Sequence, residues 1–227
     1  MAITIDQLWL GRVQLPEWHP RIDEVTADVY GFIIRHPDGV ILVDTGVGFD
    51  NSFINELYQP DLVRLDTALA GARVDEREVG AIVNTHLHFD HCGQNHALPT
   101  TPVWVTEAEQ DAATAFAYTV PEWAHLDPDR VRHPRDGEEI AEGVRLLSTP
   151  GHTAGHQSVS VTDGDDTVDV IVGQCCYCAA EFEAGPPPIA DLYDPDQLAV
   201  AQHSLDRLRA LHPRRVYFSH EAADPFT

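Results

Sequence analysis

Three histidines and one aspartate lie within six consecutive positions of this 227-residue chain, at His86, His88, Asp90 and His91. Imidazole nitrogens and carboxylate oxygens are ligands that zinc accepts, and they also suit iron, nickel and manganese. Four such side chains on one tight loop cannot all reach one tetrahedral ion without strain. We therefore expect His86 and His88 to bind one metal ion, and Asp90 and His91 to bind a second.

The elements around this loop must position it and supply the remaining ligands. The apolar run Ala81-Ile82-Val83 is typical of a buried strand and leads directly into the loop. Three further predicted strands end close to residues of the same chemical kind, namely Asp44, His152 and His220. Two glycines follow Asp44 and allow a tight turn close to the loop, although an aspartate there is also a common turn-forming residue.

The whole pattern predicts one domain of α/β class over residues 1–227. Two pairs of apolar runs flank Asp-Gly turn signals, which predicts β-hairpins within residues 29–43 and 158–172. Helical spacing and caps predict helices over residues 106–118 and 194–211. No linker or low-complexity run separates the two halves of the chain.

The composition restricts the classes of function. The chain has 37 acidic residues and 14 basic residues, all of them Arg, and its formal net charge is −23. This charge disfavours binding to nucleic acid and to anionic membranes. No segment approaches the roughly 20 apolar residues that cross a bilayer, and we find no signal-peptide pattern, so we expect a cytoplasmic protein. Three of the four cysteines crowd into residues 175–178, which indicates free thiols and not a disulfide framework.

Several motifs together resemble the metallo-β-lactamase superfamily. They are the H-x-H-x-D-H run at residues 86–91, the Gly-His-Thr run at 151–153, and His220 at the end of the last predicted strand. Residues 85–93 and 218–221 look most like the N-acyl-homoserine lactonase branch of that family. The resemblance implies an αββα four-layer sandwich, with the metal ions at the edge between its two sheets.

The resemblance also implies a set of metal ligands. The first ion is expected to be bound by His86, His88 and His152, and the second by Asp90, His91 and His220. In most members with two ions an aspartate bridges them, but this sequence has Gln174 at the corresponding place. A neutral amide oxygen binds metals weakly, so the second ion is expected to be weak or absent unless another ligand substitutes. The expected cofactor is zinc, as one or two ions, with iron as an alternative.

The residues after Gln174 leave two questions open. A thiolate from Cys175 or Cys176 is a strong zinc ligand and could replace the missing carboxylate, but free cysteines are more often small buried hydrophobes. Tyr177 stands where the lactonase branch has a tyrosine that binds the substrate carbonyl, but it could equally be a packed residue. Asp44 is a candidate acceptor for the other ring nitrogen of a ligand histidine.

The chemistry implied by such a site is hydrolysis. A metal ion held by neutral imidazoles lowers the pKa of bound water from about 16 toward about 7, so that a metal-bound hydroxide can attack a carbonyl carbon at neutral pH. Tyr177 and the metal ions would stabilise the oxyanion. Asp90 would transfer the proton.

The substrate is expected to be a neutral small molecule with an acyl group. The chain has no Lys, and relatives commonly use a lysine to hold a substrate carboxylate. We therefore expect a lactone or related ester, such as an N-acyl-homoserine lactone. Apolar residues of segments 121–134 and 184–190 are candidates for contacts with its acyl chain.

Two other classes of reaction are consistent with the sequence. Loss of the bridging carboxylate, together with the cysteine cluster, also fits a mononuclear iron dioxygenase of the persulfide-dioxygenase kind on the same fold. Gln174 also fits a non-hydrolytic member of the fold, such as a biosynthetic cyclase, isomerase or lyase, or a binding protein. Metal content separates the first alternative from the hydrolase, because two zinc ions per chain would exclude it.

Overall fold

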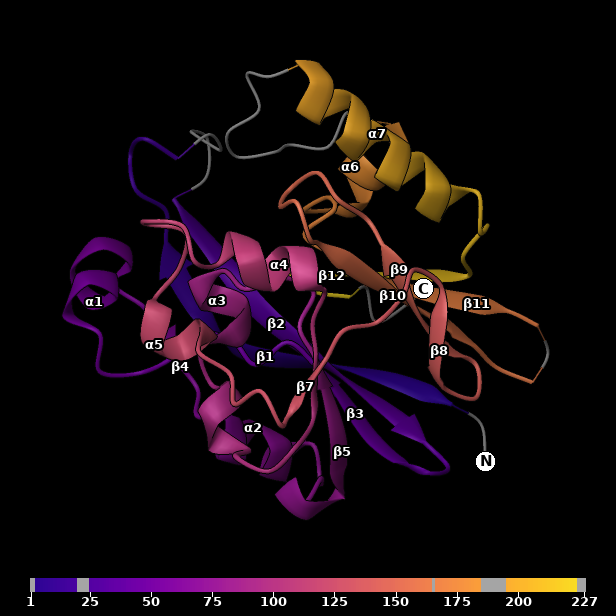
Figure 1. Ribbon diagram of the computed structural model, residues 1–227, viewed down its shortest axis with the longest axis horizontal. Coiled ribbons are helices and arrows are strands. Elements are labelled where there is room, and N and C mark those ends of the chain that lie inside the picture. Colours follow the sequence, from indigo (N-terminus) through magenta and orange to yellow (C-terminus); the bar gives the residue numbers. More distant parts are fainter. Residues whose placement is uncertain (1–2, 20–24, 165, 185–194, 224–227) are drawn as a thin grey trace.

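The computed structural model describes residues 3–19, 25–164, 166–184 and 195–223, which form two β-sheets facing each other (Figure 1). The first sheet has the strand order β4-β1-β2-β3-β5-β6-β7, and the second has the order β12-β11-β10-β9-β8. The strands of the first sheet are β1 (Thr4–Gln14), β2 (Thr26–His36), β3 (Gly39–Val43), β4 (Asp61–Leu62), β5 (Val79–Val83), β6 (Val103–Trp104) and β7 (Val131–Arg132). Those of the second are β8 (Glu138–Ala141), β9 (Val144–Ser148), β10 (Gln157–Thr162), β11 (Val168–Gly173) and β12 (Arg215–Phe218).

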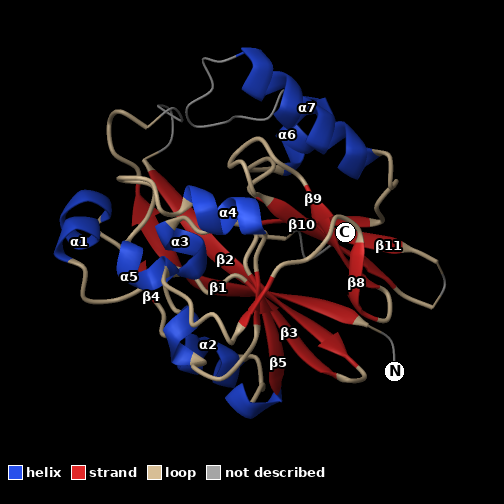
Figure 2. Ribbon diagram, in the orientation of Figure 1, coloured by secondary structure: helices blue, strands red, loops and turns tan. Residues whose placement is uncertain are grey.

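Helices lie outside both sheets (Figure 2). Those that accompany the first sheet are α1 (Ser52–Tyr58), α2 (Leu65–Gly71), α3 (Phe89–Cys92), α4 (Glu107–Ala112) and α5 (Pro121–Ala124), with short 3₁₀ turns at Glu76–Glu78 and Asn95–Ala97. Those beside the second sheet are α6 (Ala179–Ala184) and α7 (Pro195–Arg209). The predicted α/β class and the αββα order of layers are confirmed. No helix among the described residues is long and apolar enough to cross a membrane.

Strand β2 shows how the layers are held together. Its side chains alternate, so that Phe32 and Ile34 pack between the two sheets, whereas Val29 and Ile33 pack on the helical side of the first sheet. All four are almost completely buried. A strand that is covered on both faces needs a nearly continuous apolar run, and β2 has one.

Several strands end at the same edge of the sandwich. β3 and β5 are parallel neighbours in the first sheet, and β11 and β12 are parallel neighbours in the second. Gln157 joins the sheets at this edge, because its backbone N–H donates to the Thr85 carbonyl at 2.9 Å and its side chain donates to the Asn84 carbonyl at 2.8 Å. The residues that follow these strand ends include the candidate ligands His86, Gln174 and His220, and the candidate hydrogen-bond acceptor Asp44.

Most predicted elements are present, with differences at their boundaries. Both predicted hairpins form, as the antiparallel pairs β2–β3 and β10–β11. The helix predicted over residues 106–118 is shorter, because α4 ends at Ala112 and Ala117 has a φ of 60°, outside the right-handed helical region. The helix predicted over residues 194–211 is α7, and residue 194 itself lies outside the described residues. Segment 121–134, predicted to be irregular, contains α5 and β7.

The turn after β3 packs directly against the end of the histidine-rich loop. The Gly93 N–H donates to the Gly46 carbonyl at 2.8 Å, and the Thr45 N–H donates to the His91 carbonyl at 2.7 Å. A Cβ atom on Gly93 would lie 2.0 Å from the backbone nitrogen of Gly48. Only glycine therefore allows these two backbone segments to approach so closely.

Replacing Gly93 by alanine is expected to lower the free energy of unfolding by about 1–3 kcal/mol or more, because the added methyl group forces a backbone shift. Denaturant unfolding followed by circular dichroism measures this change. Gly71→Ala is the matched control, since Gly71 is the last residue of α2 and nothing lies within 4 Å of its Cβ position. Equal stability of the two variants would contradict the close packing at Gly93.

Candidate metal centre

The structure brings six of the predicted ligands together at one edge of the sandwich, in two groups. The first group is His86, His88 and His152, and the second is Asp90, His91 and His220. Within each group the candidate ligand atoms lie within 4.8 Å of one another. The pairing of these residues is the one expected from the sequence, while their role as metal ligands stays a prediction.

The first group consists of three imidazoles whose ring nitrogens converge. His86 Nε2 lies 3.1 Å from His88 Nδ1, and His152 Nε2 lies 3.0 Å from that same atom. Burial lowers the pKa of His88 to about 4 and the pKa values of His86 and His152 well below the ordinary value, so all three rings are neutral at pH 7. Two ligands about 2.1 Å from one tetrahedral zinc ion would lie about 3.4 Å apart. The donor type and spacing of this group therefore fit a divalent ion.

The Asp44 carboxylate orients rings from both groups. Asp44 follows β3 with a φ of 58° and is completely buried. Its oxygens accept from the Thr85 N–H, the Thr85 hydroxyl and His91 Nδ1, each at 2.8 Å. Because the Thr85 hydroxyl donates to Asp44, its oxygen can accept from His86 Nδ1 at 3.1 Å. His86 and His91 both keep Nε2 for the site, and a hydrogen bond from a candidate ligand histidine to Asp44 is present as predicted.

The second group places one carboxylate between two imidazoles. Asp90 Oδ2 lies 3.7 Å from His91 Nε2 and 3.8 Å from His220 Nε2. The other nitrogen of His220, Nδ1, donates to the Asp28 carbonyl at 2.8 Å. Burial alone would raise the pKa of Asp90, but the neighbouring imidazoles outweigh burial and lower it. Burial alone would lower the pKa of His91, but Asp90 and Asp44 raise it. An ionised carboxylate flanked by imidazoles is an arrangement that suits a cation.

Gln174 lies beside the second group. Its side chain is buried, its Nε2 donates to the Tyr177 hydroxyl at 2.5 Å, and its backbone N–H donates to His156 Nε2 at 3.0 Å. The amide oxygen of Gln174 has no hydrogen-bond partner among the described residues. Tyr177 stacks on the His220 ring, with the ring centroids 5.2 Å apart. Both side chains are thus placed at the second group, as expected from the sequence.

The cysteines after Gln174 belong to the core. Cys175 and Cys176 are buried in the apolar cluster that also contains Leu205 and Phe218. Burial raises the pKa of Cys175 to about 12 and raises that of Cys176 still further, so both are neutral thiols. The structure therefore supports the interpretation of these cysteines as small buried hydrophobes, and not as replacements for the missing carboxylate.

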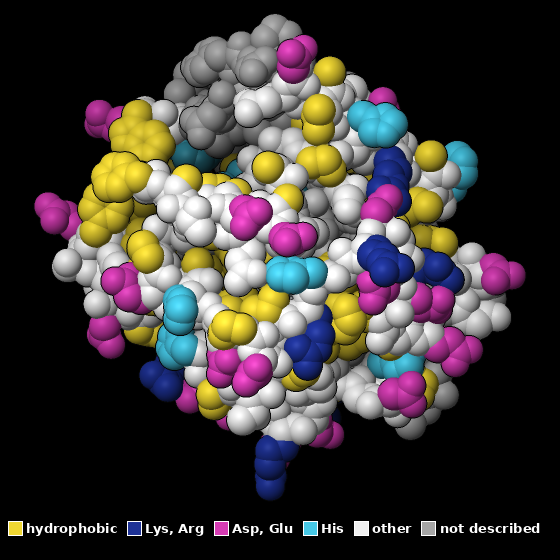
Figure 3. Space-filling view, viewed as in Figure 1, with side chains coloured by type: hydrophobic (Ala, Val, Ile, Leu, Met, Phe, Trp, Pro, Cys, Tyr) yellow, Lys and Arg dark blue, Asp and Glu magenta, His cyan; other side chains and the backbone are white. Residues whose placement is uncertain are grey.

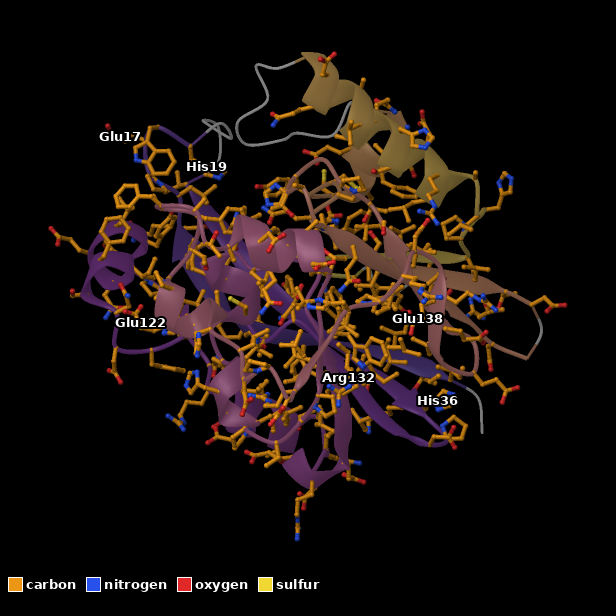
Figure 4. All side chains as sticks on the ribbon, viewed as in Figure 1. Glu17, His19, His36, Glu122, Arg132 and Glu138 are labelled. Atoms are coloured by element: carbon orange, nitrogen blue, oxygen red, sulfur yellow. The ribbon has the colours of Figure 1, made fainter. Side chains whose placement is uncertain are left out.

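Two residues that support the site were not predicted from the sequence. His156 is completely buried, its Nδ1 donates to the Thr149 carbonyl at 3.0 Å, and its Nε2 accepts from Gln174. Glu109 is also completely buried, next to the first group. No sequence signal separates His156 from the chain's other histidines, such as His36, which is the last residue of β2 and lies far from this edge (Figure 4). Glu109 lies in the first turn of a predicted helix, where acidic residues are common, so the sequence gives no sign that it supports a site.

A cavity of about 370 Å³ opens above both ligand groups. Its walls are largely apolar, and the described lining residues include no Arg. Hydrophobic side chains gather on the surface over α1 and the end of β1 (Figure 3), where Trp18 and Phe53 are both about two-thirds exposed at the rim. The predicted contribution of segment 121–134 is wrong, because α1, β1 and residues 117–120 line the cavity instead. Of the other predicted segment, residues 185–190 lie outside the described residues.

Comparisons with known proteins agree with this geometry. Residues 27–220 match the family described as the metallo-beta-lactamase superfamily. The chain is 28% identical over 211 residues to an N-acyl homoserine lactonase of Bacillus thuringiensis, covering 85% of this chain and 81% of that protein. It is 30% identical over 172 residues to an N-acyl homoserine lactonase of a Bacillus species, covering 70% and 68%.

A solved structure of the B. thuringiensis lactonase AiiA, in a mutant form, has N-decanoyl-L-homoserine bound at its active site. It matches this fold with a TM-score of 0.80 at 25% identity, covering 97% of this chain and 94% of that one. An N-acyl homoserine lactone hydrolase with N-hexanoyl-L-homoserine at its catalytic metal centre matches with the same TM-score at 26% identity, also covering 97% and 94%. The fold expected from the sequence motifs is confirmed.

Replacing Asp44 by asparagine tests how the second group is oriented. Asparagine tolerates a positive φ, but its single oxygen cannot replace both carboxylate oxygens that accept from Thr85 and His91. The zinc affinity is expected to fall about 10–100-fold, measured by competition with a chromophoric chelator. Asp38→Asn, on the exposed β2–β3 turn, is the control. An unchanged affinity in Asp44→Asn would show that the ring of His91 needs no carboxylate.

Proposed function

Since this chain belongs to the metallo-beta-lactamase superfamily, we propose that it opens neutral lactones or related esters, with N-acyl-homoserine lactones as substrates. The similarity to N-acyl homoserine lactonases extends over most of the chain, and the protein is a lactonase-like metallo-hydrolase. The proposal of a neutral lactone substrate rests on the position of both ligand groups at the base of one largely apolar cavity.

Zinc is the cofactor that the donor atoms favour. Five imidazoles and one carboxylate, in two separate groups, suit zinc, and iron is chemically compatible with the same donors. A divalent ion bound in the first group supplies a Lewis acid and lowers the pKa of a coordinated water toward neutrality. We assign His86, His88 and His152 to the first ion and Asp90, His91 and His220, with Gln174 beside them, to a weaker second ion.

Asp90 and Tyr177 are the residues that we assign to the reaction itself. The neighbouring imidazoles lower the pKa of Asp90, so its carboxylate is ionised at neutral pH and can accept the proton of the attacking water. It can then return that proton to the leaving alkoxide. Tyr177 lines the same cavity, and we propose that its hydroxyl binds the substrate carbonyl and the oxyanion that develops from it. One such donor typically contributes about 3–4 kcal/mol to the transition state.

The cavity favours an uncharged substrate with an apolar tail. Ile54 and Leu57 of α1, Val13 of β1 and Phe89 of α3 present hydrocarbon to the cavity. Among the described lining residues, Asp90 is the one carboxylate, and none is an Arg that could neutralise its charge. An anionic group near the site would therefore be disfavoured. The two acyl-homoserines bound in similar lactonase structures each carry an apolar acyl chain, which a cavity of this kind would accommodate.

The iron dioxygenase alternative has lost one of its two supports, because Cys175 and Cys176 lie in the core and not at the metal groups. Its other support, the absence of a bridging carboxylate, applies equally to a hydrolase that works with one tightly bound ion. A non-hydrolytic member of the fold has no observation of its own beyond Gln174. The lactonase proposal therefore accounts for more of the site.

Zinc-loaded protein is expected to hydrolyse N-hexanoyl- and N-decanoyl-homoserine lactone, recorded through the acid released with a pH indicator. Removal of the metal by a chelator, or the variant His88→Ala, should abolish turnover, because either change empties the first group. His36→Ala is the control, since His36 is the last residue of β2, at the distant end of the β2–β3 hairpin (Figure 4). Absence of turnover from protein shown to contain its metal would contradict the lactonase proposal.

Gln174→Asp tests the effect of the missing anion. With glutamine at this position, Asp90 is the only carboxylate in either ligand group of the described residues. The wild type is expected to retain about one zinc ion per chain after dialysis, and the variant about two, because a second buried anion favours a second dication. Elemental analysis gives the count. Gln59→Asp adds the same charge on the exposed surface and should leave the count unchanged. Two retained zinc ions in the wild type would refute this expectation.

A further inference from the structure

Glu109 is a completely buried carboxylate behind the first ligand group. It lies in α4, and its backbone N–H donates to the hydroxyl of the N-cap residue Thr106 at 3.1 Å. Glutamate is almost never fully buried unless it is paired, because its charge loses hydration. No cationic side chain in the described part of the chain forms an ion pair with it, so hydrogen bonds alone must compensate for the lost hydration.

Three neutral donors surround the carboxylate. Oε1 accepts from the Leu87 N–H at 2.8 Å and from the Tyr118 hydroxyl, and Oε2 accepts from the Thr153 hydroxyl at 2.6 Å. The carboxylate thus accepts from one buried backbone N–H and two hydroxyl groups. Hydrogen bonds to an ionised acceptor are also stronger than those between neutral groups.

These donors belong to the segments that carry the first ligand group. Leu87 stands between His86 and His88, and Thr153 directly follows His152. The ring of Tyr118 packs against the ring of His88, with the centroids 4.8 Å apart. The two loops are more than 60 residues apart in the chain, so this single carboxylate connects segments that nothing local holds together.

The start of α4 also packs tightly against the His152 loop. The Thr106 hydroxyl donates to the Gly155 carbonyl at 2.6 Å, and a Cβ on Gly155 would lie 2.1 Å from the backbone nitrogen of Glu109. Contacts between α4 and the His152 loop therefore fix the position of Glu109. Its carboxylate in turn accepts from the Leu87 N–H and so positions the loop that carries His86 and His88.

The negative charge of Glu109 would also favour a metal ion in the first ligand group. Imidazole binds a metal ion in its neutral form, so a group of three histidines leaves the full charge of a bound dication without compensation. A buried anion that contacts the backbone between His86 and His88 lowers the energy of a cation there, because charges in a low-dielectric interior are weakly screened. Neutralising this carboxylate would remove that contribution even if every hydrogen bond were replaced.

We propose that Glu109 is a positioning residue of the first metal site, whose carboxylate holds the loops of His86, His88 and His152 in a metal-binding arrangement and favours the bound cation. The inference rests on the proposed metal binding at that group. It extends that proposal to a residue outside the ligand set.

The test is the zinc affinity of Glu109→Gln, measured by competition with a chelator in the folded protein. Glutamine keeps the size of the side chain but has one acceptor oxygen and no charge, and the affinity is expected to fall about 10–100-fold. Glu107→Gln is the matched control, because Glu107 lies on the same helix and is exposed. The absorption spectrum of the cobalt-substituted protein should change for Glu109→Gln and not for Glu107→Gln, which reports ligand geometry independently of activity.

Thr153→Val provides a second test if Glu109→Gln does not fold, because it removes only the bond to Oε2, and a smaller loss of zinc affinity is expected. A merely structural role would lower the thermal stability of the metal-free variants without changing their zinc affinity or cobalt spectrum, and that result would overturn the inference. Wild-type protein that binds zinc but opens no lactone would overturn the substrate proposal alone. Wild-type protein that binds no divalent metal would overturn both.

Discussion

Ring nitrogens from distant parts of the chain converge at one edge of the sandwich, and the remaining features of the site depend on this convergence. His88 Nδ1 lies 3.1 Å from His86 Nε2 and 3.0 Å from His152 Nε2, with His86 completely buried and the other two rings lining the cavity. Where these neutral rings turn their lone pairs toward one another, as metal ligands must, no donor lies between them and the arrangement is unfavourable by itself. A bound cation removes the conflict, and the surrounding hydrogen bonds keep the rings in place.

Two buried carboxylates supply much of this support, from opposite sides. Asp44 follows a strand of the first sheet and accepts from Thr85 and His91, behind the second group. Glu109 lies in a helix and accepts from Leu87 and Thr153, behind the first group. Neither belongs to the set of candidate ligands, yet each contacts the histidine-rich loop through a backbone N–H. The loop is thus held at two points by groups that also carry negative charge toward the site.

Gln174 makes the two groups unequal in charge. Gln174 directly follows β11, and its amide nitrogen donates to the Tyr177 hydroxyl. At this position the site therefore has a neutral amide oxygen and not a charged carboxylate. Asp90 remains the carboxylate of the second group, between His91 and His220. On the proposed metal binding, this distribution would favour one firmly bound ion, and one such ion would suffice for Lewis-acid chemistry on a neutral ester.

The spacing of the candidate ligands at residues 86–91 and both hairpins could be predicted from the sequence, because turn chemistry and metal-ligand chemistry are local along the chain. The order of layers and the expected contributions of His152 and His220 came from the resemblance to the metallo-β-lactamase superfamily. The directions of buried side chains were decided only by tertiary packing. Cys175 and Cys176 stood next to Gln174 in sequence, but strand geometry turned them into the core. Glu109 had the pattern of an exposed helix start, and only the approach of two distant loops buried its carboxylate. The lining of the cavity by α1 and β1 likewise depended on contacts between segments far apart in the chain, which no local pattern encodes.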